Sequence, residues 1–193
     1  MTHDSGVLAL AFSPDGQWIA SSDGDTVRVW EAKTGHEIAR MTHSQKLIAF
    51  SPDGQWVAGA GDTIQIWEVR TGHKVAQMAQ MADVRTVDFS PDGRWLVSGS
   101  INPDGNNAAQ VWEVETGREI ARMTHPEIVR NAYFSSNGQW VVSASCDEMG
   151  ARALCLSSSA RVWDAKTGQE ISRMSHDSSL SDVAFSPNGQ WVV

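Results

Sequence analysis

One seven-residue phrase occurs five times in this chain of 193 residues, and it constrains the fold more than any other feature. The mean spacing of its copies is about 43 residues, the length of a supersecondary unit that stacks on copies of itself. The phrase reads Phe-Ser-Pro-Asp-Gly-Gln-Trp at first and occupies residues 12–18, 50–56, 89–95, 134–140 and 185–191. Four copies are followed by Val or Ile, Trp and an acidic residue, with these tryptophans at Trp30, Trp67, Trp112 and Trp163.

Each repeat divides into four short apolar runs separated by turn residues. In the first repeat the runs are 7–12, 17–21, 26–30 and 37–41, and their alternation and β-branched content favour strands over helices. The turn Ser-Pro-Asp-Gly has a mechanism: proline presets the first dihedral, aspartate bonds back to the backbone, and glycine adopts positive φ. A Thr-Gly turn follows the third run. We therefore expect antiparallel four-stranded units.

A radial array of such units, the β-propeller, buries strands on both faces. The adjacent apolar pairs Trp18-Ile19 and Trp56-Val57 fit strands of that kind. We predict an all-β propeller of about four and a half blades in a single domain, 1–193. Blades are expected to begin near residues 7, 46, 84 and 128, with a half blade of two strands from 179. The tryptophans of the first phrase, Trp56 among them, are expected to be largely buried between blades.

Taken together, the two phrases and the Thr-Gly turn resemble the WD-repeat β-propeller family, in the form of bacterial tandem repeats, over essentially the whole chain. The resemblance implies a rigid disc that presents its surface to protein partners. Bacterial relatives often join such arrays to a signalling or ATPase domain, so a sensor module is also implied by analogy. Family rings usually have seven blades.

The resemblance also implies a His–Ser–Asp–Trp hydrogen-bond set that braces a blade. His3, Ser21, Asp25 and Trp30 could form it in the first repeat, and Asp62 is the other candidate aspartate. The remaining positions before the first strand hold His43, Gln80, His125 and His176.

Family propellers close when one terminus completes the blade begun by the other, and these termini lack the strands to do so. We therefore expect an incomplete portion of a larger ring. Its apolar end strands would pair with further blades or self-associate.

Charge and composition narrow the class of partner. The net charge is −8, with 15 basic and 23 acidic residues, which argues against a nucleic-acid surface. No apolar stretch is long enough to cross a bilayer, and the first ten residues do not read as a signal peptide, so no membrane association is expected. Cys146 and Cys155 could close a disulfide, but free thiols fit better with the cytoplasmic location that we expect.

Two insertions, Ser100–Ala109 and Ser145–Ser159, depart from the repeat. Both fall between the second and third strands of their blades, so they project from one end of the propeller, where long loops on a rigid scaffold commonly bind partners. A neutral insertion in a tolerant surface loop is an equal alternative. The candidate partner-binding residues are Asn102, Asp104, Asn107, Asp147, Glu148, Met149, Arg152 and Leu154.

No catalytic, metal or cofactor motif stands out. Asn102, Asp104, Asn106 and Glu113 have calcium-loop spacing, but Asn107 replaces the required glycine, so a plain turn is favoured. The cysteines lack zinc spacing, and no dinucleotide, P-loop or nucleophile motif is present. We therefore expect no cofactor and no metal.

Three functions remain open. The first is a non-catalytic protein–protein interaction scaffold or sensor module. The second is a structural oligomer that closes a ring by self-association. The third is an enzyme with a site in the propeller channel, for which the first strands offer Lys46, Arg85, Asp88, Arg130 and Asp182 without an evident constellation.

Overall fold

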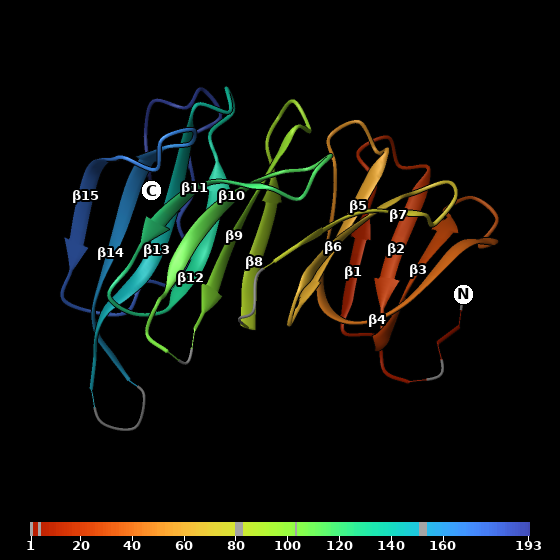
Figure 1. Cartoon of the computed structure of the whole chain (residues 1–193), viewed down its shortest axis with the longest axis horizontal. Coiled ribbons are helices and arrows are strands. Elements are labelled where there is room, and N and C mark those ends of the chain that lie inside the picture. The colour runs from red at the N-terminus through yellow and green to blue at the C-terminus, as the bar shows by residue number, and fades with distance from the viewer. Residues whose placement is uncertain (1, 4, 80–82, 103, 151–153) are drawn as a thin grey trace.

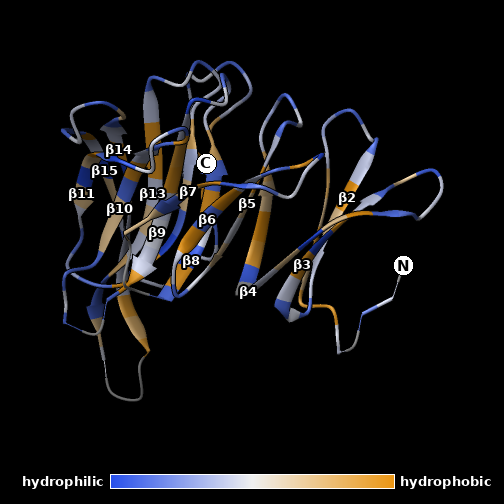
Figure 2. Ribbon diagram, turned by 45° about the vertical axis from the view of Figure 1, so that its right-hand side comes forward, coloured by the Kyte–Doolittle hydropathy of each residue, from blue (hydrophilic) through white to orange (hydrophobic). Residues whose placement is uncertain are grey.

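A computed structural model of the chain describes residues 2–3, 5–79, 83–102, 104–150 and 154–193, without the side chains of 43–45. Four blades of antiparallel strands lie side by side in a row, with the first and last blades at opposite ends (Figure 1). The predicted all-β propeller architecture is confirmed. Figure 2 shows the apolar residues concentrated in the strands and the polar residues in the connections.

The first two blades share a strand. β4 (Glu37–Phe50) pairs with β3 (Gly24–Glu31) through its first half and with β5 (Trp56–Gly61) through its second, so seven strands form one sheet. The other two blades are separate four-stranded sheets. The first sheet is completed by β1 (Ala9–Phe12), β2 (Trp18–Ser22), β6 (Ile64–Glu68) and β7 (Lys74–Met78). The third blade contains β8 (Asp83–Phe89), β9 (Trp95–Ile101), β10 (Ala108–Glu113) and β11 (Glu119–Thr124). The fourth contains β12 (Val129–Phe134), β13 (Trp140–Met149), β14 (Cys155–Asp164) and β15 (Glu170–His176).

The Ser-Pro-Asp-Gly turn folds as its residues predict. In the first copy Ser13 Oγ donates to Asp15 Oδ1 at 2.6 Å and accepts from the Trp18 amide at 2.9 Å. Asp15 Oδ1 also accepts from the Gln17 amide, and Gly16 has a φ of 70°. Asn137 takes the place of the aspartate in the fourth blade. The same turn therefore sets the register of the first two strands in every blade.

The core lies between blades rather than within them. Val27, Val29 and Met41 of the first blade pack with Val57 and Trp67 of the second, and corresponding clusters join the later blades. The most buried tryptophans are those of the second phrase, with 2–5% exposure, namely Trp30, Trp67, Trp112 and Trp163.

The first-phrase tryptophans are less buried than the sequence predicts. Trp18, Trp56, Trp95 and Trp140 are half-buried, and Trp191 is 69% exposed, so the expectation of a largely buried Trp56 is wrong. The four half-buried side chains stand at the start of the second strand, beside the turn, where they line grooves between blades.

Residues after 179 form less strand than predicted. Instead of two strands, the fifth unit has one isolated bridge between Phe185 and Val192 and a pair of hydrogen bonds between Ala184 and Val193. Val183 and Phe185 still pack on the fourth blade. A two-stranded unit with one bare side gains too little burial to hold a longer ladder.

Candidate interaction surface

The second insertion is mostly strand rather than loop. β13 and β14 each run for 10 residues, and their ladder continues beyond the repeat through Cys146–Ser158 and Met149–Cys155 pairs. The described strands of this hairpin run to the lower left of Figure 1, below the ends of β8 and β12. Its register shifts twice near Glu148, as expected where an insertion must be absorbed into a ladder.

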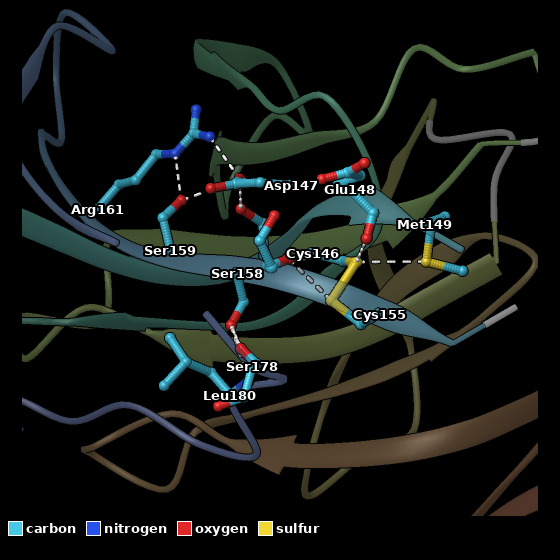
Figure 3. The surroundings of a disulfide bond; sticks show 12 residues. Cys146, Asp147, Glu148, Met149, Cys155, Ser158, Ser159, Arg161, Ser178 and Leu180 are labelled. Atoms are coloured by element: carbon cyan, nitrogen blue, oxygen red, sulfur yellow. Dashed lines mark hydrogen bonds and ion pairs between the residues drawn. A yellow bond between two sulfur atoms is a disulfide. The ribbon is translucent and has the colours of Figure 1, made fainter. Parts of the chain in front are cut away.

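A disulfide closes this hairpin. Cys146 and Cys155 are bonded across the two strands, with a Cα–Cα distance of 5.7 Å (Figure 3), so the expectation of free thiols is wrong. Strand pairing of the insertion brings the two cysteines together, which their spacing in the sequence does not reveal. The Sγ atom of Cys146 also lies 3.3 Å from Met149 Sδ, so sulfur atoms fill the inside of the hairpin.

An ion pair between the buried Arg161 and the partly exposed Asp147 lies at the base of the hairpin. Asp147 Oδ1 accepts from Arg161 Nη2 at 2.6 Å and from Ser159 Oγ at 3.0 Å, as Figure 3 shows. Burial raises the pKa of Asp147, but the bonds from Ser159 and Arg161 outweigh it and hold that pKa below its ordinary value. Arg161 also lies 3.8 Å from Glu170, so its buried guanidinium is shared between two carboxylates.

The first blade contains the complete brace, with a different aspartate from those predicted. Trp30 Nε1 donates to Ser21 Oγ at 2.7 Å, Ser21 lies 2.6 Å from His3 Nε2, and His3 Nδ1 lies 2.9 Å from Asp23 Oδ2. Asp25 is exposed, so its predicted role is wrong, because Ser21 and Asp23 lie two apart and share a strand face. In the second blade Gly59 occupies the serine register, and Asp62 is exposed.

Burial raises the pKa of Asp23, but hydrogen bonds from His3 and Thr26 hold it far below its ordinary value. Asp23 Oδ1 accepts from both the amide and the hydroxyl of Thr26. The buried Arg28 lies 3.9 Å from the same carboxylate. The brace is thus tied into a network that runs to the third strand.

The fourth blade has the same chain without its carboxylate. Trp163 donates to Ser143 at 2.8 Å, and Ser143 lies 3.2 Å from His125 Nε2. Ser145 stands at the register of Asp23, and His125 Nδ1 is buried without a hydrogen-bond partner among the described residues. Burial, aided by the charge of Arg161, lowers the pKa of His125 to about 3. His43 and Gln80 of the other blades lie outside the described side chains, and His176 is exposed.

The first insertion is a short polar turn. The Asn107 side chain accepts from the Asn102 amide at 2.9 Å, and Asn102 Oδ1 accepts from the Asp104 amide at 3.0 Å. Asn107 is buried, so its side chain holds the turn and is not available to a partner. Asp104 is exposed. This geometry matches the plain turn favoured from the sequence.

The predicted partner-binding residues separate into two groups. Asn107 and Asp147 are engaged within the chain, whereas Glu148 and Leu154 are exposed and Met149 is half-buried against the disulfide. Leu156, which the prediction omitted, is 51% exposed beside Leu154 at 63%. Arg152 lies outside the described residues.

Among the described residues, no group of three or more His, Cys, Asp or Glu side chains is arranged to hold a metal ion. No helix in the described ranges is long and apolar enough to cross a membrane. On the inner strands, burial raises the pKa of Asp88 to about 6, and its carboxylate accepts from the Phe134 amide in the next blade at 2.9 Å. Asp83 pairs with Arg85 at 2.8 Å and lies 3.8 Å from Lys46.

The repeat is matched by the family described as WD domain, G-beta repeat (WD40), at residues 1–31, 35–68, 69–113, 117–164 and 168–193. This chain belongs to the WD40 repeat family. The hydrogen-bonded brace and the two recurrent turns described above are therefore features of WD40 blades. Propellers of this family generally mediate interactions between proteins.

No curated protein sequence matches this WD40 chain. Among solved structures, Kuenenia stuttgartiensis hydrazine synthase is similar over 100% of the chain, with a TM-score of 0.79 and 17% sequence identity. The chain covers 56% of that protein's chain. At this identity the likeness shows the propeller fold alone.

Proposed function

We propose that this WD40 chain is a non-catalytic scaffold or sensor module that binds a protein partner through the extended β13–β14 hairpin. The observation that carries the proposal is that one element combines strands extended beyond the repeat, a disulfide across them and exposed apolar side chains. The disulfide and the Asp147–Arg161 pair fix the hairpin, while Leu154 and Leu156 are turned to solvent. A rigid apolar projection loses little conformational entropy on binding.

The second blade offers a template for a test. Residues 60 and 64 pair across a three-residue connection, and 144 and 160 occupy the same register in the fourth blade. Replacing 145–159 with Gly-Asp-Thr, the sequence of 61–63, removes the hairpin. The variant should also contain Arg161→Gln, since Gln65 stands at that register in the second blade. Without Asp147, the buried arginine would keep only its 3.8 Å contact with Glu170, which is costly.

We expect the trimmed chain to keep its strand content and to lose the partners that the full chain captures from a native extract. A matched control replaces 100–108 with the same three residues in the third blade, where Gly99 and Ala109 share the register. A finer variant, Leu154→Glu with Leu156→Glu, should lose the same partners without changing the fold. If the trimmed chain captures them as well as the parent does, the hairpin is not the binding surface.

The first alternative is self-association through the end strands. Phe12 of β1 is 60% exposed, whereas its equivalents Phe89 and Phe134 are covered by a preceding blade and are 5% and 8% exposed. A second copy or further blades could cover this face. Measuring the mass of the protein in solution over a hundredfold range of concentration tests it. If the mass stays monomeric throughout and the chain still captures its partner, self-association is excluded and the scaffold function remains.

The proposal assigns no catalytic role. In support, the Asp88 carboxylate is occupied by the Phe134 amide, and Asp83 is paired with a cation. The cytoplasmic location stays a prediction. The disulfide counts against it, because structural disulfides persist mainly in oxidising compartments. Trapping thiols with iodoacetamide in intact cells, followed by mass spectrometry of Cys146 and Cys155, would test it.

A further inference from the structure

The opposite end of the blades, where the Ser-Pro-Asp-Gly and Thr-Gly turns lie, carries a row of grooves between neighbouring blades. The groove between the second and third blades has a volume of about 380 Å³ and is walled by Trp56, Val75, Trp95 and Val114. Both tryptophans are half-buried, so part of each indole faces the groove. We call this the middle groove. The turns that line it and the β13–β14 connection lie at opposite ends of the blades, because successive connections between antiparallel strands alternate ends.

Acidic side chains surround these apolar walls. Asp53, Asp92, Glu113 and Glu115 line the middle groove together with one cation, Arg94. The two aspartates use Oδ1 to accept the hydrogen bonds of their own turns. Glu115 is exposed and makes no hydrogen bond or ion pair with any described residue. Glu113 also lies 3.8 Å from Arg118. The lining still holds four carboxylates and one guanidinium, so negative charge predominates around the tryptophan-lined groove.

The neighbouring grooves provide an internal comparison. The groove between the first and second blades, about 300 Å³, has one tryptophan, three carboxylates and Arg70. The groove between the third and fourth blades, about 350 Å³, has two carboxylates against Arg94 and Lys166. Among these three grooves, the middle groove therefore combines an excess of carboxylates with two tryptophan walls, although all three are built from the same repeat.

One position accounts for much of this difference. The residue before each Thr-Gly turn is basic in three blades, as Lys33, Arg70 and Lys166, and acidic in the third, as Glu115. The turn geometry is the same in all four, with the glycine at a φ between 68° and 72°. Because the turn tolerates either sign of charge, its fold does not require the acidic residue.

We propose that the middle groove binds an arginine or lysine side chain from a basic segment of a protein partner. The cation would lie against the faces of Trp56 and Trp95, which attract positive charge through the ring quadrupole. Glu115 and its neighbouring carboxylates would neutralise it and, for arginine, accept its N–H groups. This surface is independent of the hairpin, so either proposal can fail without the other.

Arg94 gives the proposal a second, opposite prediction. At its register the other four repeats have glutamine, as Gln17, Gln55, Gln139 and Gln190. Arg94 lines the middle groove and would repel an incoming cation. Replacing it by the glutamine of the sister repeats should therefore strengthen binding, whereas replacing Glu115 by the lysine of the sister repeats should weaken it.

The test uses the full chain and the probe acetyl-Gly-Arg-Gly-amide, followed by the indole N–H signals of Trp56 and Trp95 in NMR spectra. We expect saturable shifts of these two signals, and none with the matched acetyl-Gly-Gln-Gly-amide. Glu115→Lys should raise the Kd at least fivefold, and Arg94→Gln should lower it two- to threefold. Both variants introduce residues that sister repeats tolerate, so folding is preserved.

The control is Asp62→Lys, which changes the net charge as Glu115→Lys does but lies on an exposed turn at the other end of the blades. Its Kd should equal that of the parent. Equal weakening by both variants would mean diffuse attraction to an acidic protein and would overturn the site. No saturable shift with the arginine peptide, or equal shifts of Trp18 and Trp140, would overturn it as well.

Discussion

The first and fourth blades contain the same hydrogen-bond chain and differ in where the carboxylate lies. In the first, the Asp23 carboxylate is hydrogen-bonded to His3 and also lies 3.9 Å from Arg28. In the fourth, the aspartate stands two residues further along its strand, as Asp147, and it binds the equivalent arginine but not the histidine. Glu37 and Glu170 complete the arginine side in both blades, at 3.9 and 3.8 Å.

The comparison shows that a carboxylate of the second strand can bond the histidine of the brace, contact the buried arginine, or do both, depending on its position along the strand. The extended hairpin moves the aspartate outward. Arg161 therefore keeps a carboxylate partner, whereas the His125 ring has a single hydrogen-bond partner among the described residues, Ser143. The inter-strand disulfide lies next to the displaced aspartate. Four predictions follow from this difference between the blades, in order of decreasing effect.

Removing the carboxylate should be more harmful in the first blade. Asp23→Ala leaves His3 and the buried Arg28 without it, and we expect a loss of about 3–5 kcal/mol in the free energy of unfolding. Asp147→Ala should lose about 1–3 kcal/mol, because the Asp147 side chain is 21% exposed and water can replace part of the contact. Urea denaturation measures both losses. Equal losses would mean that the histidine bond adds nothing.

Opening the disulfide should affect the fourth blade alone. Reduction, or Cys146→Ala with Cys155→Ala, should lower the free energy of unfolding by about 2–3 kcal/mol, because the bond closes a loop with a sequence separation of 9. Hydrogen exchange should then become faster at Ser159 and Arg161 but not at Thr26 and Arg28. Faster exchange at all four would contradict a local role for the bond.

Acid should weaken the protein through the orphaned histidine. The pKa of His125 is lowered to about 3 in the folded chain, whereas an unfolded histidine has a pKa of about 6.5. The unfolded chain therefore binds the proton first as pH falls, so this contribution to stability is present above pH 6.5 and decreases below it. We expect a loss of about 2 kcal/mol between pH 6.5 and 5.

His125→Gln provides the matched control, since Gln80 occupies the equivalent position before the third blade. The variant lacks the titrating group, so its stability should vary less over the same pH range, whatever its absolute value. Parallel pH profiles for the two proteins would show that His125 is not the group responsible.

Restoring the missing carboxylate should have the smallest effect. Ser145→Asp places an aspartate at the register of Asp23, the residue that bonds the histidine in the first blade. Ser145 Oγ now donates to Asp147 Oδ1 at 3.2 Å, so repulsion between the two carboxylates offsets part of the gain. We expect a net gain below about 1 kcal/mol at pH 7. The pKa of His125 should rise at the same time, because the imidazolium would gain an anionic partner. NMR titration of the His125 ring protons measures the shift, and an unchanged pKa would show that the new carboxylate points elsewhere.

Much of the fold can be predicted from the sequence, because the same strand and turn pattern recurs five times. Serine, aspartate and glycine in each turn have defined chemical tasks, and Ser13, Asp15 and Gly16 perform them as expected. The candidate surface is harder to predict from the sequence than the fold. Asn107 and Asp147 are polar residues of the insertions, which makes them candidates in the sequence, but both are engaged within the chain. Leu156 is not among the candidate residues, and it is exposed.

By itself, the sequence determined the repeat length, the strand alternation, the turns and the family, since these depend on residues close together in the chain. The tertiary structure alone decided that Asp23 rather than Asp25 completes the brace, that Cys146 meets Cys155, and that Trp56 is half-buried. Each of these outcomes depends on strand register or on how one blade covers the next. A one-residue change of register turns a side chain to the other face of a strand, and composition does not reveal it.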